Sequence, residues 1–175
     1  MVDGDFLQHI SLFQDLDEKQ STLLHGLLKE VTFLPHEKII EEGQAGASLF
    51  MICSGRVKII REFDNQEFIL AELGPHDFFG EMALIDDFAA SATVETITEV
   101  TVLQLSRADF KALLRTSTEF SSVLWEALAR NLNTKIRKTD DLVKMYYGLN
   151  KALCENPQFR ELYASWNFSL PKSEP

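Results

Sequence analysis

Six consecutive residues, Phe79-Gly80-Glu81-Met82-Ala83-Leu84, have the types and the order of a phosphate-binding turn. A glycine at the start of a helix lets the main chain come close to a ligand. The first N–H groups of that helix are donors for an anion. Glu81 repels a bare phosphate, but its carboxylate can accept hydrogen bonds from two ribose hydroxyls. The pair Gly80 and Glu81 therefore predicts a sugar phosphate as the ligand.

The cation that usually accompanies a buried phosphate is missing from this part of the chain. An arginine fork forms two parallel hydrogen bonds with a phosphate group. Residues 62–106 contain no Lys and no Arg. We therefore expect the anion to be held mainly by main-chain dipoles.

Short β-strands and flanking helices are predicted to position this turn. Residues 6–13 have the apolar spacing of a short helix, and Asp17 is the expected cap of a second helix that runs through residue 29. The pattern then alternates with a period of two, and turn residues separate the runs. These runs are 31–34, 38–41, 49–53, 57–61, 67–73, 77–79, 91–97 and 100–105. Their spacing predicts a jelly roll or barrel in a mainly β, α+β fold.

Helical patterns return after the last strand. Ser106 is the expected cap of a helix over 107–114, and a long helix is predicted over about 119–147. The first half of the long helix is apolar on most sides and should pack on the β domain. The second half narrows to a stripe of apolar residues, which usually faces another helix; the alternative is that it folds back onto its own β domain. The predicted division is 1–118, 119–149 and a tail over 150–175 with one more short helix.

Composition excludes several classes of partner. The chain has 175 residues, a net charge of −10 and a pI near 4.8, which disfavours nucleic acid and anionic membrane surfaces. No stretch of ~20 apolar residues occurs, and the acidic start does not fit a signal peptide. These features predict a cytoplasmic protein in which Cys53 and Cys154 are reduced thiols. No Ser-His-Asp or Cys-His set accompanies a glycine turn, so we do not expect an enzyme, and no metal-ligand spacing is present.

An ordered set of motifs resembles the cyclic nucleotide-binding domain, which the catabolite activators share with the regulatory subunits of cAMP-dependent protein kinase. The resemblance covers residues 6–132. The motifs are Ile-Ser-Leu-Phe near the start, Glu41-Glu42-Gly43, Ser54-Gly55-Arg56-Val57, the run Leu73-Gly74-Pro75-His76-Asp77-Phe78 that leads into the turn, and Ser91-Ala92-Thr93-Val94. The resemblance implies an eight-stranded jelly roll flanked by N-terminal helices and followed by a long C-terminal helix. It also implies a cyclic nucleotide, cAMP or cGMP, as ligand, without another cofactor.

The resemblance assigns roles to individual residues. Gly80 would lie where the main chain meets the cyclic phosphate, and Glu81 would accept the ribose 2′-hydroxyl. Met82 and Ala83 would offer main-chain N–H groups, and Ser91 would donate to a phosphate oxygen. Ala90 occupies the position of the family's arginine.

Two functions remain open because of Ala90. In the first, the chain is a working sensor in which a distant cation replaces the arginine. Lys135 on the long helix is the first candidate, because the family contacts the base near this segment; Arg56 and Lys58 are more distant alternatives. In the second, the chain is a pseudo-receptor that has lost the ligand and acts through protein contacts. Gly80 would then serve a tight turn, and Glu81 would cap the helix that follows.

The long helix and the tail decide the expected partners. The stripe predicts a homodimer through Leu132, Ile136, Leu142, Val143, Tyr146 and Leu149. Residues 151–175 are too few for the winged helix-turn-helix of the catabolite activators, so we expect no DNA contact. A further protein partner is compatible with either function.

Overall fold

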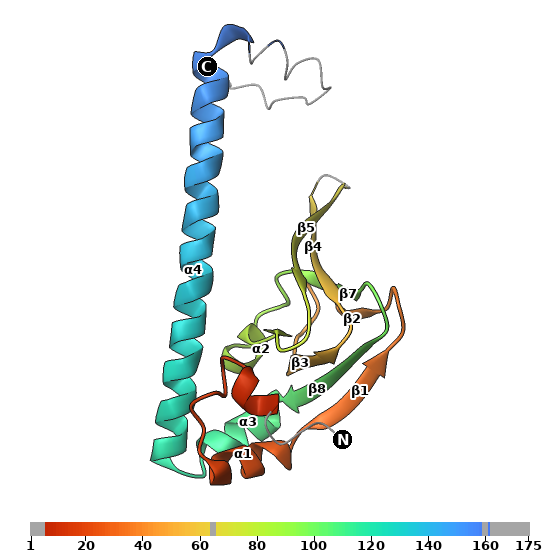
Figure 1. Cartoon of the computed structure of the whole chain (residues 1–175), viewed down its shortest axis with the longest axis vertical. Helices are drawn as coiled ribbons and strands as arrows, with labels where there is room; N and C mark the ends of the chain where they lie inside the picture. Colours follow the sequence, from red (N-terminus) through yellow and green to blue (C-terminus); the bar gives the residue numbers. More distant parts are fainter. Residues whose placement is uncertain (1–5, 64–65, 159–160, 162–175) are drawn as a thin grey trace. The chain divides into compact units, whose positions relative to one another are not determined.

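The computed structural model describes residues 6–63, 66–158 and 161 (Figure 1). Its elements follow in the order η1 Phe6–His9, α1 Glu18–His25, β1 Lys29–Phe33, β2 Lys38–Ile40, β3 Ser48–Ser54, β4 Val57–Phe63, β5 Gln66–Leu73, β6 Phe78–Phe79, α2 Met82–Ile85, β7 Thr93–Thr96, β8 Val100–Ser106, α3 Arg107–Leu114 and α4 Thr118–Glu155. The elements predicted up to the long helix are present with shifted ends, and α4 extends to residue 155, beyond the predicted 147. The short helix predicted in the tail lies largely outside the described residues. The first is a 3-10 helix of four residues, shorter than the helix predicted over 6–13.

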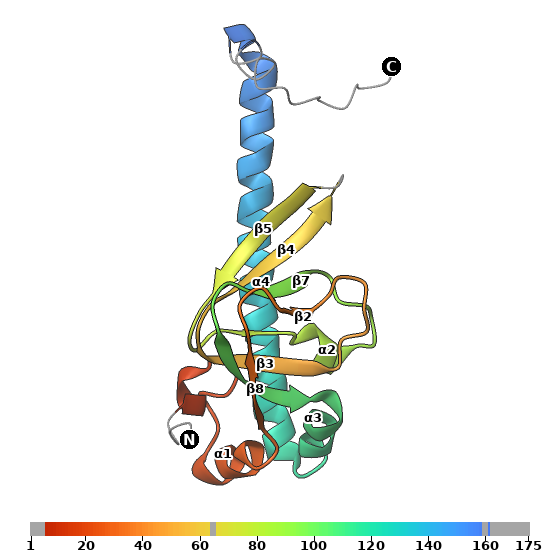
Figure 2. The ribbon, with the colours of Figure 1, turned by 90° about the vertical axis from the view of Figure 1, so that its right-hand side faces the viewer.

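The strands form two four-stranded antiparallel sheets, which confirms the predicted jelly roll. One sheet has the order β1-β8-β3-β6 and the other has the order β2-β7-β4-β5. Figure 2 shows β3 beside β8 in the first sheet and the long β4–β5 hairpin in the second. Each sheet joins strands that are far apart in the chain, as jelly-roll connections require.

Alternating side chains of the central strands supply two hydrophobic clusters. On β3, Leu49 and Met51 belong to the cluster that the helices share, whereas Phe50 and Ile52 belong to a second cluster with residues of both sheets. Successive side chains of a strand point to opposite faces, so β3 has apolar residues on both. This explains why the run over 49–53 is apolar without interruption.

Two predicted caps are confirmed. The Asp17 carboxylate accepts from the Gln20 N–H at 2.8 Å, and the Gln20 side chain accepts from the Asp17 N–H at 3.0 Å, which completes a capping box. The Ser106 hydroxyl accepts from the Asp109 N–H at 3.1 Å. Helix α1 ends at His25, before the predicted residue 29, because Gly26 follows it. Lys29 is already the first residue of β1, where it pairs with Gln104 of β8.

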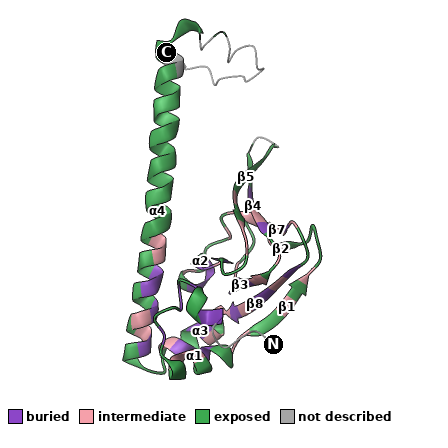
Figure 3. Cartoon of the chain, viewed as in Figure 1, coloured by how far each residue is buried: buried purple, intermediate pink, exposed green. Residues whose placement is uncertain are grey.

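The contacts divide the chain inside α4, into residues 1–129 and 130–175. The predicted boundary at 118/119 differs because the first turns of α4 bury apolar side chains in the first unit; these are Phe120, Leu124, Ala127 and Leu128. Figure 3 shows this change from buried to exposed residues along the helix. Among the described residues, no helix combines the length and the apolar character that crossing a bilayer requires.

Candidate functional site

Residues 80–91, here called the cassette, begin where β6 leaves the sheet. Phe78 and Phe79 are both buried, and Phe79 stacks on Phe50 of β3 with ring centroids 5.2 Å apart. Gly80 has a φ of 81°, which side chains rarely adopt. A Cβ at Gly80 would lie 2.5 Å from the Ser48 carbonyl oxygen. The tight turn expected at Gly80 is therefore present, and only glycine fits it.

Glu81 is buried, with 4% of its surface exposed, and directly precedes α2. Its backbone is helical (φ −63°, ψ −30°), and its side chain makes no capping hydrogen bond to the helix. A capping side chain usually needs an extended backbone at that residue. The interpretation of Glu81 as the cap of this helix is therefore wrong.

The predicted phosphate donors lie at the two ends of the cassette: the main-chain N–H groups of Met82 and Ala83 near its start, and Ser91 at its end. The Ala83 N–H donates to the Gly80 carbonyl at 3.2 Å, so the turn itself already uses this expected phosphate donor. The Ser91 hydroxyl lies 3.9 Å from the Met82 sulfur, which brings the end of the cassette next to α2. The structure thus gathers five of the predicted residues around one short helix: Gly80, Glu81, Met82, Ala83 and Ser91.

Ala90 pairs with a loop that precedes β3. Its N–H donates to the Gln44 carbonyl at 2.8 Å, and its carbonyl accepts from the Gly43 N–H at 2.9 Å. Ala89 forms a bridge with Ala45 in the same loop. We call residues 43–46 the loop. Ala90, which occupies the position of the family's arginine, is therefore held against the loop.

A hollow of about 200 Å³ lies beside the loop and β2. Its lining consists of Lys38, Ile39, Ile40, Glu41, Gln44, Ala45, Gly46, Ala47, Ser48 and Phe50. Gly80 borders three of these, because a Cβ there would lie within 3.5 Å of Ile40, Ser48 and Phe50 atoms. The hollow is smaller than the ~300–1,000 Å³ of most small-molecule sites. Lys38, which contributes to its rim, lies 4.0 Å from the Glu41 carboxylate.

Arg107 is the cation that the sequence analysis missed. Its guanidinium donates to the carbonyl oxygens of Ala83 and Gly46 and pairs with the Asp87 carboxylate. The residue follows directly after the run without Lys and Arg that ends at Ser106. The pairing of β3 with β8 is the signal that could have found it. Ser106 lies opposite Ser48, so the next residue, Arg107, comes close to the loop that precedes β3.

Two of the cations predicted from the sequence form ion pairs outside the cassette. Arg56 pairs with Glu72 at 3.9 Å, and Lys58 pairs with Glu95 at 2.9 Å, on the strands of the second sheet. Lys135 is exposed on α4 and belongs to the unit over 130–175. Its contact with a ligand stays a prediction.

The described residues offer little for metal or thiol chemistry. They contain no group of three or more His, Cys, Asp or Glu side chains that could hold a metal ion. Burial raises the pKa of the Cys53 thiol, and the negative charge of Glu30 raises it further. Since the thiolate is the nucleophile, these effects lower the reactivity of Cys53.

Known proteins match the same part of the chain. A family model described as the cyclic nucleotide-binding domain matches residues 30–117. A CRP-like cAMP-activated global transcriptional regulator of Mycobacterium tuberculosis is 31% identical over 140 residues, which are 79% of this chain and 62% of that protein. The chain therefore spans less than two thirds of the length of this relative.

Solved structures agree with the fold. The N-terminal domain of a transcriptional regulator from Streptomyces coelicolor is 34% identical, with a TM-score of 0.69 over 79% of this chain and 95% of that one. The regulatory subunit of a cAMP-independent protein kinase A from Trypanosoma brucei is 28% identical, with a TM-score of 0.63 over 73% of this chain and 44% of that one.

Proposed function

The chain belongs to the cyclic nucleotide-binding domain family, and from that premise we propose that it is a non-enzymatic sensor that binds cAMP or cGMP at the cassette. The relatives with this domain are regulatory proteins by name, and one is a cAMP-activated regulator. The cytoplasmic location and the lack of a nucleic-acid or membrane partner stay predictions from the sequence.

Buried Glu81 is the observation that carries this proposal. Glu81 is buried directly after the Gly80 turn, at the start of α2. The resemblance places the acceptor for the ribose 2′-hydroxyl at this residue, and a carboxylate can accept hydrogen bonds from ribose hydroxyls. The position of Glu81 next to an anion-binding turn therefore supports a sugar phosphate as the ligand.

The phosphate would be held by the start of α2 and by Ser91. A hydrogen bond to a charged group contributes on the order of 1.5–3 kcal/mol. Replacing the family's arginine with Ala90 therefore weakens binding by roughly ten- to a hundredfold. We accordingly expect a dissociation constant in the micromolar range, which is weaker than that of a site that keeps the arginine.

Ligand binding would reach α4 through the shared hydrophobic cluster. Leu84 of α2 belongs to the same buried cluster as Phe120 and Leu124 at the start of α4. A shift of α2 on binding would change how these side chains pack, and so would change the balance between two positions of the helix.

Titration with fluorescent cAMP and cGMP tests the sensor. We expect saturation of the wild-type chain below ~10 µM and a loss of roughly ten- to a hundredfold for Glu81→Ala. Ala90→Arg should raise the affinity by a similar factor, because it restores the arginine fork. Ala89→Arg is the matched control, since it adds the same charge one residue away. Absence of saturation at millimolar ligand for the wild-type chain would rule the sensor out.

A pseudo-receptor is the second candidate function. Ala90, the small hollow and the use of the Ala83 N–H within the turn favour it. The Trypanosoma brucei relative is described as cAMP-independent, and a triple mutant of it, with one substitution to arginine, is bound to cAMP. If this candidate is right, the wild-type chain binds no cyclic nucleotide and Ala90→Arg creates binding.

We also propose that the chain forms a homodimer through α4. The predicted stripe is exposed in the single chain, with Ile136, Leu142, Val143 and Tyr146 each at least 60% exposed. Such apolar side chains on a helix usually contact a partner helix. Light scattering at tens of micromolar should give twice the monomer mass of 19.9 kDa; a monomer mass would contradict the proposal.

A further inference from the structure

We infer that Arg107 is the positioning residue of the cassette: its guanidinium joins three segments around the proposed phosphate site and holds them in place before a ligand arrives. The effect of Arg107 on ligand affinity rests on the proposed function, whereas its effect on the order of the cassette does not. The role differs from that of the arginine replaced by Ala90, which would contact the ligand itself.

Each branch of the guanidinium binds a different segment. Nε donates to the Ala83 carbonyl in α2, and Nη2 donates to the Gly46 carbonyl in the loop. Nη1 pairs with Asp87, which lies between α2 and Ala90. The arginine side chain is 17% exposed, whereas the Asp87 side chain is 81% exposed. The other two contacts, to the Ala83 and Gly46 carbonyls, are made to partly buried main-chain groups. These contacts hold the planar guanidinium in one orientation.

The same segments are joined to each other. The loop exchanges hydrogen bonds with Ala90 through Gly43 and Gln44. A Cβ at Gly46 would lie 3.1 Å from the Ala83 Cβ, so the loop and α2 already approach tightly. Arg107 thus closes a ring of contacts that runs from α2 to the loop, from the loop to Ala90, and back through Asp87.

The ring is attached to a rigid strand. Arg107 is the first residue of α3 and follows Ser106, the last residue of β8. The Arg107 N–H donates to the Ala47 carbonyl at 2.8 Å, and β8 pairs with β1 on one side and β3 on the other. The guanidinium therefore links the cassette directly to the end of a central strand of the first sheet.

Charge and fork geometry can be separated by substitution. Arg107→Lys keeps the positive charge but provides a single point donor that cannot reach three acceptors at once. Asp87→Asn keeps both main-chain contacts and removes only the ion pair. Arg56→Lys is the matched control, because Arg56 forms an exposed pair with Glu72 on the second sheet.

Hydrogen exchange of the full chain, measured by mass spectrometry, tests the inference. In Arg107→Lys we expect amides of residues 80–91 to exchange about tenfold faster, the factor for losing one hydrogen bond to a charged group, with β3 and β8 unchanged. Asp87→Asn should give a smaller increase, and Arg56→Lys should give none in the cassette. Unchanged cassette exchange in Arg107→Lys, or an equal increase throughout the β domain, would overturn the inference.

Titration with cAMP supplies the second readout. We expect Arg107→Lys to bind about tenfold more weakly than the wild-type chain, and saturating cAMP to return its cassette exchange to the wild-type rate. A wild-type chain that binds no cyclic nucleotide would refute the proposed function, while the exchange experiment would still decide the role of Arg107. Wild-type affinity in Arg107→Lys together with fast cassette exchange would overturn the link between order and binding.

Discussion

At the scale of single residues, His76 and Gly80 both have a left-handed backbone conformation. His76 has a φ of 71°, in the turn that leads into β6. Its ring lies 5.4 Å from that of Phe6 and 5.2 Å from that of His9. These tilted ring contacts with the N-terminal segment offset part of the backbone strain, which for such a residue is of order 1–3 kcal/mol. Gly80 avoids the same strain by having no side chain.

Thr96 is a buried hydroxyl that joins β7 to the turn between β1 and β2. It is fully buried, donates to the Leu34 carbonyl at 2.6 Å and accepts from the Glu37 N–H at 2.9 Å. Thr96→Val keeps the shape but leaves both main-chain groups without this partner. We expect urea unfolding to show a loss of about 1–3 kcal/mol. Thr96→Ser, which keeps the hydroxyl, should lose less; an equal loss would contradict the assignment to hydrogen bonds.

Glu95 gives the β domain a defined dependence on pH. The hydrogen bond from Lys58 lowers the pKa of the Glu95 carboxyl, and the charges of Lys58 and His36 lower it further. A lowered pKa in the folded state contributes stability above the unfolded value, and this contribution is lost as pH falls through the folded value. Lys58→Met should therefore reduce the free energy of unfolding at pH 7 and have a smaller effect at pH 3. An effect of the same size at both values would contradict this linkage.

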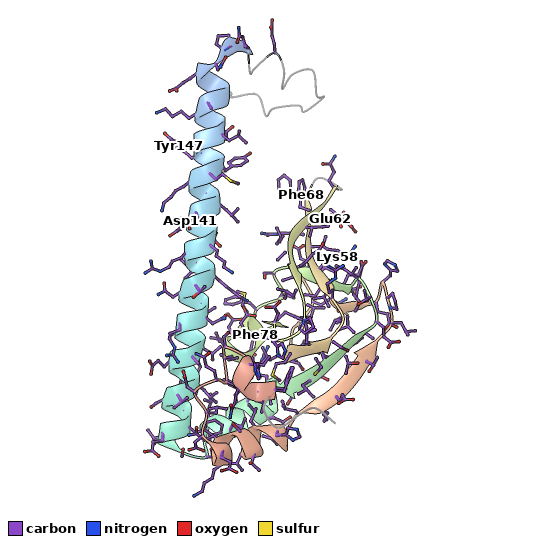
Figure 4. The ribbon with its side chains drawn as sticks, in the orientation of Figure 1. Lys58, Glu62, Phe68, Phe78, Asp141 and Tyr147 are labelled. Carbon is purple, nitrogen blue, oxygen red and sulfur yellow. The ribbon has the colours of Figure 1, made fainter. Side chains whose placement is uncertain are left out.

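At the scale of elements, α4 has two different surfaces along its length. Its first turns share the buried cluster with α2, α3 and the first sheet. From residue 133 to residue 152 its side chains are exposed, and Figure 4 shows Tyr147 projecting from it. The β4–β5 hairpin also exposes apolar side chains, including Phe68 and Leu70. Exposed apolar residues in series usually mark contact surfaces.

A charge placed on the α4 stripe should prevent the proposed dimer. Val143→Glu puts a carboxylate into an apolar helix contact, where burial without a partner is unfavourable. Light scattering should then give a monomer mass at concentrations where the wild-type chain is a dimer. Thr134→Glu is the control, because Thr134 is exposed and none of the residues three or four positions away from it belongs to the stripe. Loss of the dimer in both variants, or in neither, would show that the stripe is not the interface.

At the scale of the whole molecule, charge is unevenly divided along the chain. Residues 1–129 have nine basic and 22 acidic residues, a net charge of −13. Residues 130–151 have six basic and two acidic residues, a net charge of +4. The low pI of the chain therefore conceals a basic helix segment.

This division predicts how salt affects association. Two basic helix segments repel each other in the proposed dimer, and salt screens that repulsion. We expect the dimer fraction in sedimentation equilibrium to increase as the NaCl concentration is raised from about 50 to 500 mM, where the Debye length shortens severalfold. A decrease would show that the basic segment binds an acidic surface instead.

Local patterns were sufficient for most of the fold. Alternation marked the strands, and Asp17 and Ser106 marked helix starts, because capping and periodicity depend on neighbours in the chain. The turn at Gly80 was predictable for the same reason. The ends of η1 and α1 were not, since burial and pairing with β8 decide where those elements stop.

By itself, then, the sequence determined the jelly roll, the Gly80 turn and the absence of an arginine at Ala90. Only the tertiary structure decided that Glu81 is buried without capping α2 and that Arg107 binds the cassette. Arg107 and Gly46 are 61 residues apart, and they meet because β3 and β8 pair with Ser48 opposite Ser106. Composition over a window cannot reveal such a contact, because it arises from the register of paired strands.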